Sequence, residues 1–133
     1  MKINTKIRYA LRMLVLLAEN SDVINTEILG KEMLVSPKYL RKLAGPIEKV
    51  GLILSVQGKY GGYKLNRKPE EILISDVFNA YDESLLISGC TRNSGCVLAD
   101  DCVTSNLWDY FENLISKKFF NISLNQIISG SFI

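Results

Sequence analysis

The sequence predicts a mainly α-helical protein with one small β-hairpin. The chain has 133 residues, of which 47% are hydrophobic, and this suits one domain, or one domain with a short appended element. Apolar residues recur at helical spacing near both ends of the chain. In its middle, a Gly-rich connection at residues 57–62 separates two short apolar stretches, which is typical of a hairpin.

The first predicted helix covers residues 5–19, with Thr5 as its cap. One side carries Ile7, Ala10, Leu11, Leu14, Leu17 and Ala18, and another side carries Tyr9, Met13 and Leu16. A helix that is apolar on more than one side is buried on more than one side. We therefore expect this helix to contact a second subunit as well as its own core.

Two shorter helices are expected next. The second helix of the chain begins at Asn25 or Thr26. The third begins at Ser36 and Pro37, because serine is a favoured N-cap and proline is tolerated at the first helical position. The Gly-Pro pair at 45–46 predicts a kink or a weak turn within it. The buried stripe of the third helix is Leu40, Leu43, Ala44, Ile47 and Val50.

The exposed start of the third helix is basic and polar. Two short helices joined by a tight turn, the second starting in this way, are typical of a helix-turn-helix, whose second helix reads bases in the major groove. The candidate DNA-binding residues are Thr26, Ser36, Pro37, Lys38, Tyr39, Arg41 and Lys42. An ordinary helical hairpin with a solvated basic face is the alternative.

The hairpin follows directly, with strands expected over residues 52–56 and 63–65. A hairpin after a recognition helix is the wing of a winged helix, where basic side chains contact the DNA backbone or minor groove. Its candidate DNA-binding residues are Gln57, Lys59, Tyr60 and Gly61. In the alternative, the glycine pair at 61–62 is needed only for the turn. Residues 1–68 are therefore predicted to form a winged helix-turn-helix DNA-binding domain.

Residues 69–133 are predicted to hold a cysteine loop and a long C-terminal dimerisation helix. Ser75 caps a short helix over residues 76–81, the long helix begins at Ser105 or Asn106, and a short helix over 123–129 follows. The long helix carries an apolar seam of Leu107, Trp108, Phe111, Leu114, Ile115 and Phe119.

This seam is too apolar to face water. We expect a homodimer, formed through the 105–120 helix and the first helix, because two-fold pairing of identical helices is the commonest solution. Burial of the seam within its own chain is the alternative.

The cysteine loop spans residues 88–104 and holds all three cysteines, Cys90, Cys96 and Cys102, each separated from the next by five residues. Its flanks are rich in Gly, Ser, Asn and Asp, which predicts a loop that can surround a ligand. Three thiols cannot form a closed set of disulfides. The pattern favours a metal or iron–sulfur site that lacks one obvious ligand, and a redox-inert loop is the alternative.

Charge and composition narrow the class of function. Residues 1–74 contain 13 Lys/Arg and 7 Asp/Glu, a balance of +6, whereas residues 75–133 contain 3 and 7, a balance of −4. A basic first half fits a polyanion partner, and a solvated surface with uneven charge is the alternative. Together with the predicted winged helix-turn-helix, we expect this partner to be double-stranded DNA. The chain has no histidine and no recognisable catalytic motif, so we expect that the protein is not an enzyme. It shows neither a signal peptide nor an 18-residue apolar run, so we expect a cytoplasmic protein with no membrane contact.

Several motifs occur here in combination: Arg8-Tyr9-Ala10-Leu11-Arg12, Ser36 with Tyr39 and Leu40, Gly51-Leu52-Ile53, Gly58-x-x-Gly61-Gly62-Tyr63-x-Leu65, and Ile74-Ser75-Asp76-Val77. With them, nearly the whole chain resembles the IscR/NsrR/CymR-type family of bacterial winged-helix transcription regulators. The three cysteines match its cluster-binding branch in count and spacing. The resemblance implies a [2Fe–2S] or [4Fe–4S] cluster on these cysteines, which controls DNA affinity in response to redox state, nitric oxide or iron–sulfur status.

The chain departs from that family at three positions. Ser105 stands where IscR-like proteins have a histidine ligand, and Arg8 stands where some NsrR-like proteins have an aspartate ligand. Gln57 replaces an arginine before the wing glycine, which implies a different target sequence. The nearby oxygen candidates for a fourth ligand are Asp100, Asp101, Ser105 and Asp109, and an open iron position is the alternative.

Two other functions fit the same residues. The three thiols can form a disulfide or persulfide switch without a cluster. The winged domain can also dock a protein instead of DNA, and a steep loss of nucleic-acid binding with added salt would argue against that.

Overall fold

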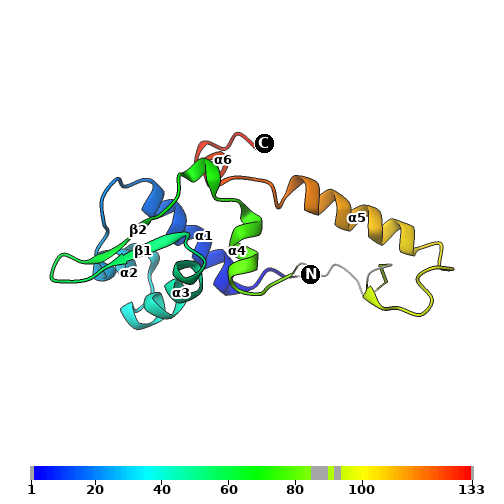
Figure 1. Ribbon diagram of the computed structural model, residues 1–133, viewed down its shortest axis with the longest axis horizontal. Helices are drawn as coiled ribbons and strands as arrows, with labels where there is room; N and C mark the ends of the chain where they lie inside the picture. The colour runs from blue at the N-terminus through cyan, green and yellow to red at the C-terminus, as the bar shows by residue number, and fades with distance from the viewer. Residues whose placement is uncertain (1, 85–89, 92–93, 133) are drawn as a thin grey trace.

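The computed structural model describes residues 2–84, 90–91 and 94–132. Its elements, in chain order, are α1 (Thr5–Ala18), α2 (Thr26–Met33), α3 (Pro37–Lys49), β1 (Ile53–Val56), β2 (Gly62–Leu65), the 3-10 turn η1 (Pro69–Glu71), α4 (Ile74–Ala80), α5 (Ser105–Lys118) and α6 (Leu124–Ser129). Figure 1 shows a compact body that contains every element except α5, and α5 extends from it as an arm. No helix of the described residues is long and apolar enough to cross a membrane.

The body is built around α1, which packs against α2, α3, α4, α6 and β2. Its buried residues include Met13, which has no exposed surface. Met13 therefore belongs to the core of its own chain, because the body surrounds α1 on more sides than the sequence pattern indicated. The expected contact of this helix with a second subunit stays a prediction. Tyr9 and Leu16, from the same predicted side, are half-buried against the core of their own chain.

The hydrophobic core contains residues from both sides of the predicted domain boundary at residue 68. Ile72, Val77 and Phe78 belong to the same cluster of buried side chains as Leu14 of α1 and Leu40 of α3. The division of the chain at 68 and 69 into two domains stays a prediction.

Three local expectations are corrected. The α1 cap is Asn4, not Thr5, because the Asn4 side chain accepts a hydrogen bond of 2.9 Å from the Lys6 N–H. The helix α4 begins at Ile74, one residue before the predicted Ser75 cap. The helix α3 continues through the Gly-Pro pair at 45–46 without a break. Buried residues on both sides of that pair hold α3 to the core, which offsets the hydrogen bond that proline cannot donate.

The hairpin β1–β2 is antiparallel, with Ile53 opposite Leu65 and Val56 opposite Gly62. A third strand segment joins it: Ile24 and Tyr63 exchange two backbone hydrogen bonds of 2.9 and 3.0 Å. The wing is therefore tied to the segment that immediately precedes α2.

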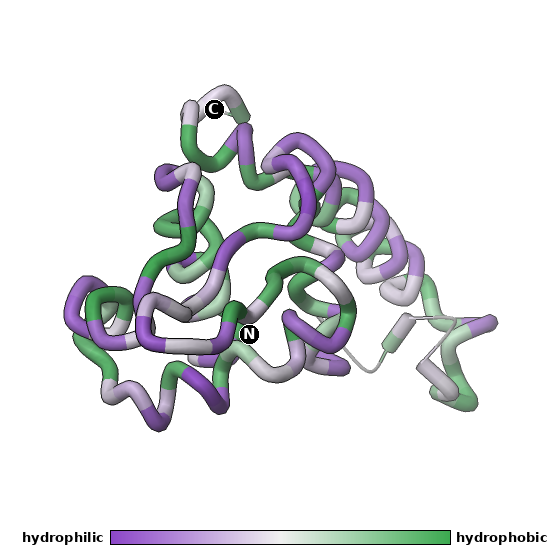
Figure 2. The backbone as a smooth tube through the Cα atoms, turned by 60° about the vertical axis from the view of Figure 1, so that its left-hand side comes forward, coloured by the Kyte–Doolittle hydropathy of each residue, from purple (hydrophilic) through white to green (hydrophobic). Residues whose placement is uncertain are grey.

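The residues of the predicted apolar seam of α5 differ in exposure. Trp108, Ile115 and Phe119 are half-buried within the chain. Leu107, Phe111 and Leu114, together with Tyr110, are 56, 36, 40 and 62% exposed. Figure 2 shows apolar segments on α5 and on the cysteine loop at its far end, away from the body.

Candidate nucleic-acid interface and cysteine loop

The predicted recognition helix starts as the sequence indicates. The Ser36 hydroxyl accepts a hydrogen bond of 3.1 Å from the Tyr39 N–H, and Pro37 occupies the first helical position. Both residues are exposed, as are Lys38 and Arg41. Tyr39 is half-buried, and its ring meets the Tyr9 ring edge-on at 6.1 Å between centroids. The start of α3 therefore offers positive charge and a capped, well-defined backbone to a polyanion.

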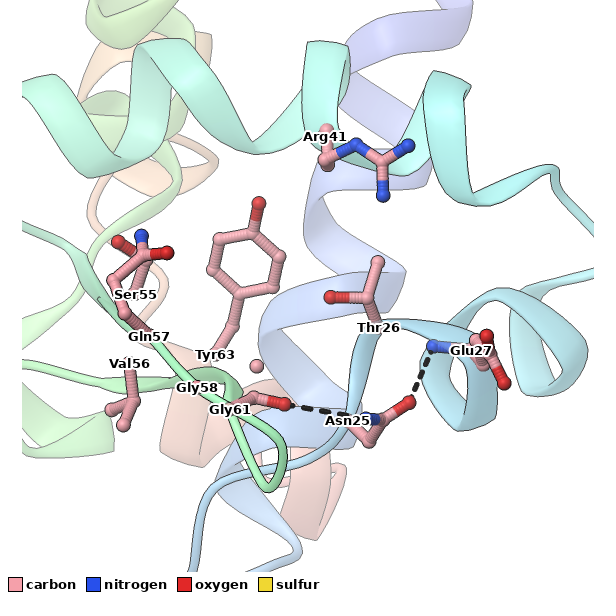
Figure 3. Close-up of a pocket in the computed structure, with 11 residues that line it drawn as sticks. Asn25, Thr26, Glu27, Arg41, Ser55, Val56, Gln57, Gly58, Gly61 and Tyr63 are labelled. Atoms are coloured by element: carbon pink, nitrogen blue, oxygen red, sulfur yellow. Dashed lines mark hydrogen bonds between the residues drawn. The ribbon is translucent and has the colours of Figure 1, made fainter.

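A surface hollow of about 280 Å³ lies between the start of α2, α3 and the wing. Figure 3 shows Arg41 directed from α3 toward the start of α2, and Tyr63 directed from β2 toward α3. Thr26 and Gln57, both predicted DNA-binding residues, line the same hollow. The fold thus brings residues of the helix-turn-helix and the wing, separate in sequence, to one concave surface.

Asn25 connects the wing to α2 at the edge of this hollow. Its side-chain oxygen accepts a hydrogen bond of 2.8 Å from the Glu27 N–H, and its amide donates one of 3.4 Å to the Gly61 carbonyl (Figure 3). Gly61 is buried, and a Cβ there would lie 2.0 Å from the Val56 carbonyl oxygen. The glycine therefore has a structural reason of its own, besides its predicted DNA contact.

Two ionisable neighbours act on the Tyr63 phenol beneath the hollow. Burial raises the pKa of Tyr63, the Glu48 carboxylate raises it further, and the Arg41 guanidinium opposes the shift. Glu48 also accepts a hydrogen bond of 2.7 Å from the Ser55 hydroxyl of β1. Tyr63 therefore stays a neutral phenol near physiological pH.

The remaining predicted residues lie outside the hollow. Lys42 lies with Lys6 of α1 around another hollow of about 310 Å³, on a different side of α3 from Arg41. Lys59 and Tyr60 form the wing tip, where the Lys59 ammonium is 5.6 Å from the Tyr60 ring centroid and Tyr60 is 85% exposed. The predicted contact set is thus spread over the hollow, the wing tip and one flank of α3.

Seven residues that line the hollow were not among the predicted DNA contacts: Asn25, Glu27, Ser55, Val56, Gly58, Gly62 and Tyr63. The sequence offered a signal for Asn25 as a possible cap and for Gly58, Gly62 and Tyr63 as parts of the wing motif. It offered none for Glu27, Ser55 and Val56 as members of this surface, because their place there depends on how the wing folds back onto α2.

None of the three cysteines is joined in a disulfide; Cys90 is exposed, and Cys96 and Cys102 are half-buried. The Cys102 sulfur lies 3.0 Å from the Thr104 hydroxyl oxygen. That hydrogen bond, followed by backbone N–H groups of Thr104 and Ser105, lowers the pKa of the Cys102 thiol. Hydrogen bonds to sulfur favour the thiolate, which is both the nucleophile and the metal ligand.

The loop contains suitable donors for an iron–sulfur cluster but does not gather them. Within residues 2–84, 90–91 and 94–132, no three His, Cys, Asp or Glu side chains lie close enough together to hold a metal. Ser105, at the position of the missing histidine, is 1% exposed, and its hydroxyl donates to the Cys102 carbonyl at 2.7 Å. In this arrangement the three thiols do not form an assembled cluster site.

The sequence family Rrf2, described as an iron-dependent transcriptional regulator, matches residues 3–130. This chain belongs to the Rrf2 family. A curated member, the HTH-type transcriptional regulator IscR of Aliivibrio salmonicida, is 34% identical over 131 residues, which cover 96% of this chain and 77% of the relative. The predicted family resemblance is confirmed, and so is the expectation that the chain is a transcription regulator and not an enzyme.

Solved structures of Rrf2-type proteins share the fold. The global cysteine regulator CymR of Bacillus subtilis aligns with a TM-score of 0.79 at 24% identity, over 97% of both chains. The oxidised form of Staphylococcus aureus CymR aligns with a TM-score of 0.72 at 30% identity, over 96% of both chains. The predicted mainly helical, winged helix-turn-helix fold is confirmed. As an Rrf2 regulator the protein binds DNA, and the hollow beside α3 is the candidate surface.

Proposed function

We propose that this protein is a homodimeric regulator that binds operator DNA through the start of α3, the hollow and the wing tip. The observation that carries this is the joint surface of Arg41, Thr26 and Gln57 next to the exposed Lys38. In this arrangement the start of α3 enters the major groove, and Lys59 at the wing tip reaches the flanking backbone or minor groove.

In the proposed homodimer, the two copies contact each other through their arms. The exposed residues Leu107, Phe111 and Leu114 lie along one face of α5, and pairing that face with its two-fold copy removes it from water. The dimer then sets the separation of the two α3 helices, which must match half-sites about one DNA turn apart.

The cysteine loop controls DNA affinity in this proposal, and an iron–sulfur cluster is its leading ligand. The description of the family as iron-dependent and the name of the IscR relative support iron. The three thiols would supply three ligands, and the loop must draw together from its described arrangement to hold a cluster. When bound, the cluster would supply a centre that responds to oxidants, nitric oxide or iron–sulfur supply.

A thiol switch is the second candidate for the same loop. The lowered pKa of Cys102 and the absence of a gathered metal site among the described residues favour it. A relative of this fold, Staphylococcus aureus CymR, is known in an oxidised form. Two of the three thiols would lose two electrons and two protons to an oxidant and form a disulfide, leaving one free thiol.

One set of measurements separates these alternatives. The protein is purified without oxygen, its visible absorption is recorded, and its thiols are counted before and after mild oxidation. Binding to genomic DNA fragments is then measured over a salt series for wild type and Cys96→Ala. A chromophore lost in Cys96→Ala supports the cluster, and loss of two thiols on oxidation without a chromophore supports the switch. DNA binding identical in all loop states would refute control by the loop.

A further inference from the structure

The arm and the cysteine loop are attached to the body at both ends of one short helix, α4. At the end of the arm, the Phe120 carbonyl accepts from the Ser75 N–H at 3.2 Å, and the Phe78 ring lies 5.2 Å from the Phe120 ring and 6.2 Å from the Phe119 ring. Phe78 is itself 4% exposed. These contacts join the end of the arm to α4.

The other end of α4 leads directly to the cysteine loop and is closed by a Schellman motif. Asp82 adopts a left-handed conformation, with φ of 52°. The Glu83 N–H donates to the Phe78 carbonyl at 3.0 Å, and the Asp82 N–H donates to the Asn79 carbonyl at 3.1 Å. These bonds fix the backbone of residues 82 and 83, where the chain leaves α4.

Two side chains at this exit bind the DNA-binding body. The Tyr81 hydroxyl donates a hydrogen bond to the backbone carbonyl of Leu43, in the middle of the recognition helix α3. The Asn4 amide, at the cap of α1, donates to the Glu83 carboxylate at 2.8 Å. The first of these bonds joins the loop exit to the helix that carries Lys38 and Arg41.

The cysteine loop cannot act on the wing of its own chain by direct contact, because Figure 1 places them at opposite ends of the molecule. A physical route between them is needed, and α4 packs on both α1 and α3. Within that packing, Tyr81 makes a directional bond to α3 that fixes one helix relative to the other, whereas apolar contacts allow sliding.

We propose that Tyr81 is a positioning residue for DNA binding: its hydroxyl couples the state of the cysteine loop to the position of α3 through the Leu43 carbonyl. This inference rests on the proposed control of DNA affinity by the loop. A single neutral hydrogen bond of ordinary strength limits the effect of Tyr81 to about a two- to tenfold change in DNA affinity between loop states.

The test variant is Tyr81→Phe, which keeps the buried ring and removes only the hydroxyl. The matched control is Tyr9→Phe, which removes a hydroxyl from α1 and leaves the bond between α4 and α3 intact. DNA dissociation constants are measured for each protein in three loop states: reduced, oxidised with diamide, and reconstituted anaerobically with ferrous iron and sulfide. The readout is the ratio of dissociation constants between states.

We expect the ratio of DNA dissociation constants between loop states to be about two- to tenfold smaller in Tyr81→Phe than in the wild-type protein. In Tyr9→Phe we expect the wild-type ratio. Equal weakening of DNA binding in every state, with an unchanged ratio, would show a structural role only and overturn the inference. If the wild-type protein binds DNA equally well in the reduced, oxidised and reconstituted states, the proposed control by the loop is refuted, and the coupling through Tyr81 with it.

A second measurement covers the case in which Tyr81→Phe does not fold. Amide hydrogen exchange of residues 37–49 is compared between the same loop states in the wild-type protein. Coupling through Tyr81 predicts altered protection in α3 around Leu43. Unchanged exchange there, in states that differ in DNA affinity, would overturn the inference without any variant.

Discussion

Gly62 lies where no side chain fits. A Cβ there would be 1.9 Å from the Ile24 carbonyl oxygen and 2.8 Å from the Asn25 Cα. The glycine allows β2 to approach the segment before α2 and to complete the hydrogen-bonded pair of Ile24 and Tyr63. The close approach, and not DNA contact, is the first reason for glycine at this position.

We therefore expect Gly62→Ala to destabilise the protein by about 2 kcal/mol or more, because backbone atoms must move, and to weaken DNA binding by displacing the wing. Gly45→Ala is the matched control: a Cβ there meets nothing within 4 Å, and alanine in a helix interior stabilises by about 0.5–1 kcal/mol. Urea unfolding measures the free energy of unfolding of both variants. Equal values for Gly62→Ala and Gly45→Ala would contradict the close approach of β2 to the segment before α2.

Cys102 and Thr104 form the second residue-scale test. The Thr104 hydroxyl lowers the pKa of the Cys102 thiol, so cluster-free protein should show a Cys102 that reacts with iodoacetamide at lower pH than an ordinary thiol. In a background of Cys90→Ser and Cys96→Ser, Thr104→Val should shift the pH profile of alkylation upward, because the thiolate loses its donor. Thr104→Ser keeps the hydroxyl and should keep the profile. Identical profiles for the valine and serine variants would exclude this hydrogen bond as the cause.

At the scale of elements, α5 differs from the other helices. Of its residues only Ser105 is buried, whereas α1 and α3 each bury a full stripe of side chains. A helix of 14 residues with so little packing gains little stability from its own chain. In the proposed dimer, its exposed face at Leu107, Phe111 and Leu114 is the surface that the second copy covers.

We expect Leu114→Glu to convert a dimer into a monomer, because it places a charge in the centre of the paired apolar faces. Ser116→Glu adds the same charge on the opposite side of α5, at an exposed position, and should leave the dimer intact. Sedimentation analysis over a range of protein concentrations measures both. A wild-type protein that stays monomeric at micromolar concentration would refute the role of α5.

Across the whole molecule, positive charge is concentrated in the body and negative charge toward the loop and the arm. The basic residues 1–74 make up most of the body, and the acidic residues 75–133 include the loop and the arm. DNA phosphates should therefore meet the body and be repelled by the loop end.

This predicts a steep dependence of DNA binding on salt, because cations released from the phosphates drive association. Lys38→Gln should reduce the slope of log K against log salt by about one, the value for one lost phosphate contact. Lys118→Gln, on the arm, should leave the slope unchanged. Equal effects of the two substitutions would argue against the start of α3 as the phosphate-binding surface.

Local sequence patterns predict the helices, the hairpin and their order along the chain. Helical spacing, the Ser36–Pro37 start of α3 and the glycines of the wing are reliable signals, because the physical effects behind them act within a few residues. The same signals placed Thr26, Arg41 and Gln57 among the candidate contacts, and all three line one hollow. Cap positions were less certain, since Asn4 and Thr5 are chemically similar caps and only the start of the helix distinguishes them.

Which surfaces are covered depends on the packing of elements that are distant in sequence. Met13 is buried because α1 is surrounded by other elements. In the α5 seam, Phe119 packs against the core of the body, whereas Leu107 and Leu114 stay exposed. Tyr81 meets Leu43 across 38 residues of sequence. Such contacts depend on how elements pack across long sequence separations, and no local pattern encodes them.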